Sequence, residues 1–236
     1  MAPYAKEELL ACALARLIGD AGHVAVGAAS PIPATAAFFS KASYNKKLRI
    51  SLLHKRAGNP FTEGSRELFD LAGQGRIDVF FLGGAQIDGD ANINLVQAED
   101  KRFPGSFGSA FMYFAAGRTI LFREEHSKRV LVPKVDFISA PGWSAPEVER
   151  RGGPQALLTG KALFAWQKDE RRFRLESVHP GTSLEEILDS TGFEFDRGPD
   201  AKVTPVPSAG ELALLRSAVA SQIAANYPDF AQRVWP

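Results

Sequence analysis

Glycines and short polar side chains follow an apolar stretch in FFLGGAQIDGDANIN, which runs from Phe80 to Asn94. The carboxyl end of a strand in a parallel sheet is a common place for a ligand to bind. Gly83 and Gly84 would let a ligand or another part of the chain approach the backbone closely. The alternative is a tight turn in which Asp88 and Asn92 bond to their own backbone. The residue types alone favour the turn.

A calcium site is the first specific chemistry to test against this segment. Asp88, Asp90 and Asn92 have the alternate spacing with which a calcium-binding loop begins. However, Ile93 lies at the position where such a loop requires a glycine. The segment therefore predicts no calcium site.

A second glycine-rich segment, RFPGSFGSAF, precedes a predicted helix. Gly105, Ser106, Gly108 and Ser109 lie where the free N–H groups of a helix start favour a phosphate or a developing oxyanion. A serine that simply caps the helix explains the same residues equally well. Both interpretations stay open on the sequence alone.

The four histidines are isolated from one another. None has the HxH or HExxH spacing of a metal site, and the chain has neither a GxSxG motif nor a P-loop. His179, in SVHPG, is typical of a turn before a helix. His54 differs because it ends an apolar segment and is followed by Lys55 and Arg56. An imidazole there could act as a general base, so His54 is the candidate catalytic residue.

Helical and extended segments alternate in the first third of the chain. Residues 5–20 have leucines and alanines at helical spacing, with Lys6, Glu7, Glu8 and Arg16 on the other face. The segments expected next are a strand at 23–30, a helix from Pro33, a strand at 48–54, a helix at 64–75 and a strand at 77–84. These strands are apolar on both faces, which is typical of a parallel sheet covered by helices.

The rest of the chain has a different pattern. The expected elements are a helix at 107–117, strands at 118–125 and 129–139, a hairpin over 156–180 that turns at 168–170, and helices at 183–192 and 208–227. Proline and glycine around 140–154 indicate a long connection. We expect an α/β fold with a mainly parallel central sheet flanked by helices and a more antiparallel C-terminal half, in a single domain over 1–236.

The composition limits the classes of partner. Lys and Arg number 28 against 27 Asp and Glu, without long runs of one sign, so we expect neither a nucleic-acid nor a membrane partner. The single cysteine, Cys12, lies among alanines and is expected to pack inside a helix. The N-terminal segment is charged early, and no stretch approaches the roughly 18 apolar residues of a membrane span. A cytoplasmic protein fits these features best.

Four separated motifs, taken together, resemble the β subunits of the family I CoA-transferases, such as the B-type subunit of glutaconate CoA-transferase. They are GRIDVFFLGGAQIDGDANIN, RFPGSFGSA, SKRVLVPKVDFISAPGW and HPGTSLEEILDSTGFEFD, in this order. The resemblance covers the chain from about Val24 to Phe195. Related subunits occur in the ring-cleaving acyl-CoA hydrolases of steroid breakdown.

The resemblance implies a CoA-transferase-type fold and an active site completed by an α-subunit-like partner. It also implies an acyl-CoA thioester as substrate, no permanently bound cofactor, and a β-subunit glutamate that attacks the thioester. The glycine-rich segment of the family, GSGGA, corresponds to the segment with Gly105, Ser106 and Gly108, where Phe107 replaces one glycine. These three residues, with Gly83 and Gly84, are therefore the candidate residues for binding substrate or CoA.

The nucleophile position departs from the family. The family has ESG at the end of the second strand, whereas this chain has LLHKRAG, so the position falls on His54, Lys55 or Arg56. Glu63 and Glu67 follow nearby, but they belong to a loop and a predicted helix, and we expect neither to be the nucleophile. Enzyme activity is accordingly left open.

Three functions follow from these observations. The first is a CoA-transferase family I subunit that acts on an acyl-CoA thioester with an α subunit. The second is an acyl-CoA hydrolase, cleaving a thioester or a carbon–carbon bond, that lacks a β-subunit glutamate nucleophile. The third is a non-catalytic subunit that binds CoA or stabilises its partner.

Overall fold

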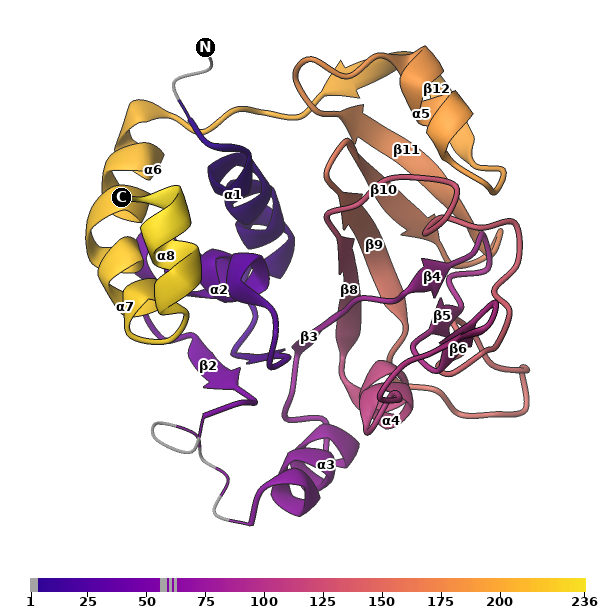
Figure 1. Cartoon of the computed structure of the whole chain (residues 1–236). Coiled ribbons are helices and arrows are strands. Elements are labelled where there is room, and N and C mark those ends of the chain that lie inside the picture. The colour runs from indigo at the N-terminus through magenta and orange to yellow at the C-terminus, as the bar shows by residue number, and fades with distance from the viewer. Residues whose placement is uncertain (1–3, 56–58, 60, 62) are drawn as a thin grey trace. The chain divides into compact units, whose positions relative to one another are not determined.

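The computed structural model describes residues 4–55, 59, 61 and 63–236. The chain divides into two compact units, and Figure 1 labels many of their elements. The first unit comprises Met1–Gly64, Ile77–Val79 and Pro205–Pro236, and the second comprises Ser65–Arg76 and Phe80–Thr204. The expectation of a single domain over 1–236 stays a prediction.

The first unit combines a parallel pair of strands with helices from both ends of the chain. Its elements are α1 (Lys6–Ile18), β1 (His23–Val26), α2 (Pro31–Ser43), β2 (Arg49–Leu52), α6 (Ala209–Leu214), a π-helical segment (Leu215–Val219), α7 (Ala220–Ala224) and α8 (Pro228–Val234). β1 pairs in parallel with β2, with Val26 opposite Leu52. The helix predicted over 208–227 is thus divided by a π-helical segment.

Helix α1 has one side chain on an unexpected side. Glu8, predicted on the polar face, is buried. Arg216 donates to its carboxylate through Nε at 2.8 Å and through Nη2 at 2.9 Å, and the indole of Trp235 donates at 3.0 Å. Since a buried charge needs such partners, the C-terminal helices explain why Glu8 can lie in the interior.

The second unit contains most of the strands. Its elements are α3 (Ser65–Gly73), β3 (Val79–Leu82, whose first residue belongs to the first unit), β4 (Gln86–Ile87), β5 (Ile93–Asn94), β6 (Gln97–Ala98), β7 (Lys101–Arg102), α4 (Ser109–Ala115), β8 (Arg118–Arg123), β9 (Pro154–Thr159), β10 (Ala162–Gln167), β11 (Arg172–Val178), α5 (Leu184–Ser190) and β12 (Asp196–Val203). β8 and β9 are parallel, β9, β10 and β11 are antiparallel, and β11 and β12 are parallel.

These pairings confirm the predicted fold class. Parallel strands alternate with helices in the first part of the chain, and the antiparallel hairpin turns between Gln167 and Arg172, as predicted. The strand predicted at 129–139 is wrong: within this segment Leu131 forms an isolated bridge with Ile87, and Ala140, just after it, forms one with Ile93. The N–H groups of Val135 and Asp136 in this segment donate to side chains that are described below.

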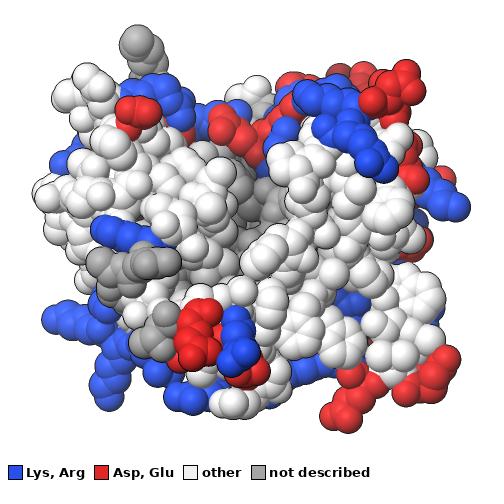
Figure 2. All heavy atoms as spheres, turned by 60° about the horizontal axis from the view of Figure 1, so that its bottom comes forward, with Lys and Arg blue, Asp and Glu red and all other residues white. Residues whose placement is uncertain are grey.

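The burial of Cys12 and the distribution of surface charges agree with what the composition predicted. Cys12 is buried, and burial raises the pKa of its thiol to about 12, so the predicted packing role is confirmed. Figure 2 shows Lys and Arg atoms interspersed with Asp and Glu atoms around a largely uncharged middle of the face in view. Among the described residues, no helix is both long and apolar enough to cross a membrane.

Candidate functional site

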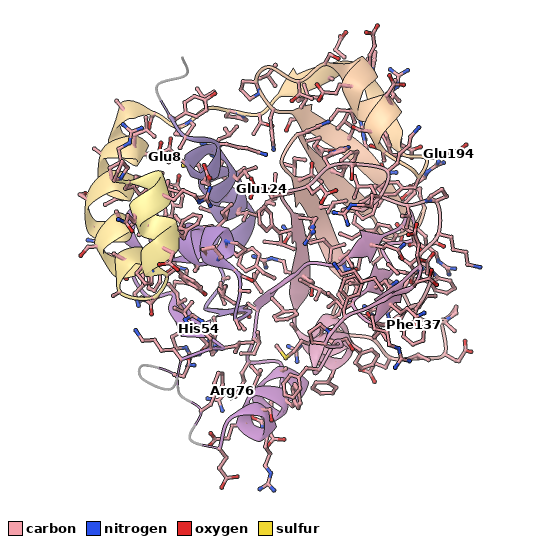
Figure 3. All side chains as sticks on the ribbon, in the orientation of Figure 1. Glu8, His54, Arg76, Glu124, Phe137 and Glu194 are labelled. Carbon is pink, nitrogen blue, oxygen red and sulfur yellow. The ribbon has the colours of Figure 1, made fainter. Side chains whose placement is uncertain are left out.

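The candidate base His54 lies just beyond the carboxyl end of β2, where Figure 3 labels it. The parallel register continues past the strand, because the Leu53 N–H donates to the carbonyl of Val26 at 2.9 Å. His54 therefore lies at the same sheet edge as residues 27–30, which lead into α2. Its side chain is exposed, so water and a substrate can reach the imidazole.

The imidazole has one polar partner from the C-terminal part of the chain. The Tyr227 hydroxyl and His54 Nδ1 are 3.3 Å apart, and the two rings are tilted with centroids 4.8 Å apart. Burial raises the pKa of Tyr227 to about 12, so the phenol stays protonated at neutral pH. Beside this pair, Lys55 Nζ donates to Asn226 Oδ1 at 2.7 Å. Two successive residues of one C-terminal loop thus contact two successive residues after β2.

The other residues considered for the nucleophile position have no comparable geometry. Arg56 lies outside the described residues. Glu63 is in the loop that precedes α3, and Glu67 is in the first turn of that helix, as predicted. The described residues directly after β2 are Leu53, His54 and Lys55, so none of them carries a carboxylate.

The segment PGSFGSA forms the turn that starts α4 in the second unit. Gly105 has a φ of +110°, a conformation that suits glycine. Gly108 lies against Phe69, since a Cβ there would be 2.2 Å from the ring. Phe107 has a φ of +44° and is 84% exposed. An exposed ring on a residue in the left-handed region contributes little to the stability of the chain itself, and such a conformation is unfavourable for a bulky residue. Phe107 is therefore a candidate residue for contact with a ligand or a partner.

Serines of this turn do not cap the helix as the simpler interpretation expected. The N-cap of α4 is Gly108, and no side-chain cap is formed there by the described residues. Ser109 is the first helical residue, and its hydroxyl donates backwards to the carbonyl of Ser106 at 2.6 Å. The assignment of Gly105, Ser106 and Gly108 to substrate binding stays a prediction.

Contacts within the second unit explain why positions 83 and 84 are glycines. A Cβ at Gly83 would lie 2.7 Å from the Phe122 carbonyl oxygen, and one at Gly84 would lie 2.6 Å from that of Gln86. The close approach allowed by these glycines is therefore made by the chain itself. Their part in binding substrate or CoA also stays a prediction.

Asp88 organises the polar cluster that follows β3. The buried carboxylate accepts through Oδ1 from the N–H groups of Asp90 and Asn92 at 3.1 and 3.0 Å. Through Oδ2 it accepts from Asn92 Nδ2 at 3.2 Å and from the Val135 N–H at 3.3 Å. Burial raises the pKa of Asp88, while the hydrogen bonds from Asn92 and Val135 act against that rise. The cluster is a turn that also holds a distant segment.

Two more side chains, those of Gln86 and Asn92, bind the chain near Val135. The Gln86 amide donates to Asp136 Oδ2 at 3.0 Å and accepts from the Asp136 N–H at 3.0 Å. The Asn92 side chain accepts from the Gly142 N–H at 3.1 Å. We call Gln86, Asp88 and Asn92 the polar clasp. Within the irregular segment 129–139, the clasp thus satisfies the N–H groups of Val135 and Asp136.

Two other histidines are core residues. His179 lies before α5, as expected, but it is buried, with Nε2 2.9 Å from the carbonyl oxygen of Thr159. A carbonyl only accepts, so Nε2 carries the proton. His126 is buried between the hydroxyls of Thr159 and Thr191, at 2.7 and 2.9 Å. Burial lowers the pKa of His126 to about 4, which keeps the ring neutral.

Sequence reasoning missed Tyr227, because no local pattern links it to a residue 173 positions earlier. Among the described residues, no cluster of three or more His, Cys, Asp or Glu side chains could hold a metal ion.

Comparisons with known proteins agree with this architecture. Residues 14–190 match the family described as Coenzyme A transferase. The B-type subunit of glutaconate CoA-transferase from Acidaminococcus fermentans is 32% identical over 130 residues, which cover 50% of this chain and 48% of the relative. The B-type subunit of 3-oxoadipate CoA-transferase from Pseudomonas knackmussii is 31% identical over 163 residues, which cover 64% of this chain and 62% of the relative. The matches thus span about half to three fifths of these relatives.

Proteins named for other activities are similar as well. The cholesterol ring-cleaving hydrolase IpdB subunit of Rhodococcus jostii is 30% identical over 165 residues, 64% of this chain and 62% of the relative. The structure of R. jostii IpdAB has a TM-score of 0.82 at 23% identity, covering 99% of both chains. The decarboxylase AibA/AibB has a TM-score of 0.77 at 25% identity, covering 98% of both chains. The chain belongs to the Coenzyme A transferase family.

Proposed function

We propose that this chain is a B-type subunit that acts on an acyl-CoA thioester together with an α-subunit-like partner. The family match over residues 14–190 and the likeness to the B-type subunits of two CoA-transferases support the substrate class. The likeness to AibA/AibB and to an IpdB subunit, whose names indicate assemblies of more than one chain, supports a two-chain assembly. The coenzyme A thioester is then a substrate and not a resident cofactor, and we propose a cytoplasmic location for the chain.

The observation that carries the proposal is His54 at the carboxyl end of β2, in the region where the family resemblance implies the nucleophile. Covalent transfer through a carboxylate of this chain requires an acid there, and the described residues directly after β2, Leu53, His54 and Lys55, provide none. Transfer would then use a carboxylate from the partner.

A second candidate function is hydrolysis, which the His54–Tyr227 pair favours. In the tautomer in which His54 Nδ1 carries the proton, Nδ1 donates a hydrogen bond to the Tyr227 oxygen. The lone pair of Nε2 can then accept a proton from water. The resulting hydroxide attacks the thioester carbonyl, the C–S bond breaks, and the CoA thiolate takes up the proton from the imidazole. The likeness to an IpdB subunit supports this alternative.

The test is turnover of an acyl-CoA panel by the complex of this chain with its α-subunit-like partner. A transferase incorporates a labelled carboxylic acid into CoA thioester, whereas a hydrolase releases free thiol without an acceptor. If His54 is the base, His54→Ala abolishes thiol release and Tyr227→Phe lowers kcat about tenfold. Lys128→Ala, at an exposed residue far along the chain, serves as the control. A complex that forms but has neither activity contradicts the proposal and indicates a non-catalytic subunit.

A further inference from the structure

The second unit contains a cavity of about 530 Å³ beside the ends of its strands. It lies near the beginnings of β8 and β9, the hairpin turn between β10 and β11, and the connection 142–153. The volume is within the range of small-molecule sites, roughly 300–1,000 Å³. None of the residues proposed above for the acyl-CoA chemistry lines this cavity.

The cavity wall has an excess of positively charged side chains. Five cationic side chains and one carboxylate line it: Arg118, Arg150, Arg151, Lys168, Arg171 and Asp169. They come from positions 118 to 171, so the nearly neutral sequence gives no local sign of this concentration of charge. Guanidinium groups in a concave wall are well suited to bind phosphate oxygens.

Two indole rings line the same cavity. Trp143 is 39% exposed, and the Arg171 guanidinium lies 4.1 Å from its ring centroid. Trp166 and Phe173 pack in a T-shaped arrangement, with ring centroids 5.0 Å apart. Flat aromatic surfaces next to arginines can stack with a heterocyclic base while the cations bind its phosphates.

The wall is held in place by its own backbone contacts. Arg150 donates to the carbonyl oxygens of Tyr113, Pro141 and Gly152, so it anchors the connection. A Cβ at Gly142 or at Gly152 would lie 2.2 Å from a carbonyl oxygen, so both positions pack directly on neighbouring backbone. A cavity formed before the ligand arrives loses less entropy on binding.

We propose that this cavity binds an adenine nucleotide, with Lys168 and Arg171 contacting its phosphates and Trp143 its base. Binding of a free nucleotide would go beyond the acyl-CoA function, whereas binding of coenzyme A would rest on that proposed function. The phosphates and base have two sources, the 3′-phospho-ADP part of coenzyme A and a free nucleotide such as ADP or ATP.

The test is a titration of the full-length chain, followed by tryptophan fluorescence and calorimetry. ADP should bind saturably, at least about tenfold more tightly than pyrophosphate or adenosine, because only ADP has both parts. Lys168→Glu and Arg171→Gly should each weaken ADP binding about tenfold or more, since each removes a charged contact to phosphate. Arg171→Gly suits the fold, because the backbone φ at this position is +52°. Trp143→Ala should weaken ADP binding and leave pyrophosphate binding unchanged.

Lys128→Glu is the matched control, because it makes the same charge change at an exposed residue outside the cavity. Tighter binding of coenzyme A and 3′-phosphoadenosine 5′-phosphate than of ADP would assign the site to the coenzyme. Equal or tighter binding of ADP or ATP would assign it to a free nucleotide. The proposal is overturned if ADP does not bind saturably, if pyrophosphate binds as tightly as ADP, or if the control weakens binding as much as Lys168→Glu. Since no step requires turnover, a failed acyl-CoA assay leaves this result unaffected.

Discussion

The stability of the second unit should fall between pH 7.5 and pH 5 because of His126. The ring is 5% exposed and lies between two threonine hydroxyls. Burial lowers its pKa from 6.5 to about 4, so the unfolded chain binds a proton in this range and the folded chain does not. The contribution of the neutral His126 ring to the free energy of unfolding is therefore complete above pH 6.5, and it is lost as the pH falls toward 4.

The size of the effect follows from the two pKa values. The difference of about 2.5 pKa units corresponds to roughly 3 kcal/mol in total, at about 1.4 kcal/mol per unit. About 2 kcal/mol of this is lost between pH 7.5 and pH 5, before most carboxylates begin to titrate. A loss of that size is a large part of the stability of an ordinary domain.

The assay is urea unfolding, followed by circular dichroism at pH 7.5, 6.5, 5.5 and 5. In His126→Gln the side chain does not titrate, so the variant should be less stable at pH 7.5 but should lose about 2 kcal/mol less on going to pH 5. If the parent and the variant lose equal stability over this range, the reasoning about His126 is refuted.

Three further outcomes can be checked on the isolated chain. Phe107→Gly should raise the free energy of unfolding by about 1 kcal/mol, because glycine adopts a φ of +44° without strain; a loss of stability would mean that the contact with Phe69 matters more. Asp88→Asn should cost about 2–4 kcal/mol, because an amide nitrogen then replaces an oxygen that accepts hydrogen bonds; unfolding at the parent's urea midpoint would argue against the polar clasp. Cys12 should resist a thiol reagent at pH 8 in the native protein and react after unfolding, and fast native labelling would contradict its burial.

The fold class was predictable because periodicity is a local property of the sequence. The helix at 5–20, the strands around β1 and β3 and the β10–β11 hairpin all follow from nearby residues. The segment 129–139 was mispredicted as a strand, since the N–H groups of Val135 and Asp136 donate to the side chains of Asp88 and Gln86, which come from another part of the chain. Local patterns cannot express such a dependence.

The candidate site was predictable only in part for the same reason. His54 was identified from its position after a strand, and its place at the sheet edge agrees with that expectation. Tyr227, the burial of Glu8 and the basic cavity depend on residues that meet only in the folded chain. The polar clasp shows the opposite case: its residues were recognised as a marked motif, while their structural role required the partner segment.

The most direct test of the proposed function is the fate of an acyl-CoA thioester in the presence of the complex with the α-subunit-like partner. Thiol release and incorporation of labelled carboxylic acid are measured in the same reaction, for the parent and for His54→Ala. We expect the parent to consume the thioester by one of these routes, and His54→Ala to abolish release if hydrolysis is the route. An intact complex that leaves every thioester of the panel unchanged would contradict the proposal.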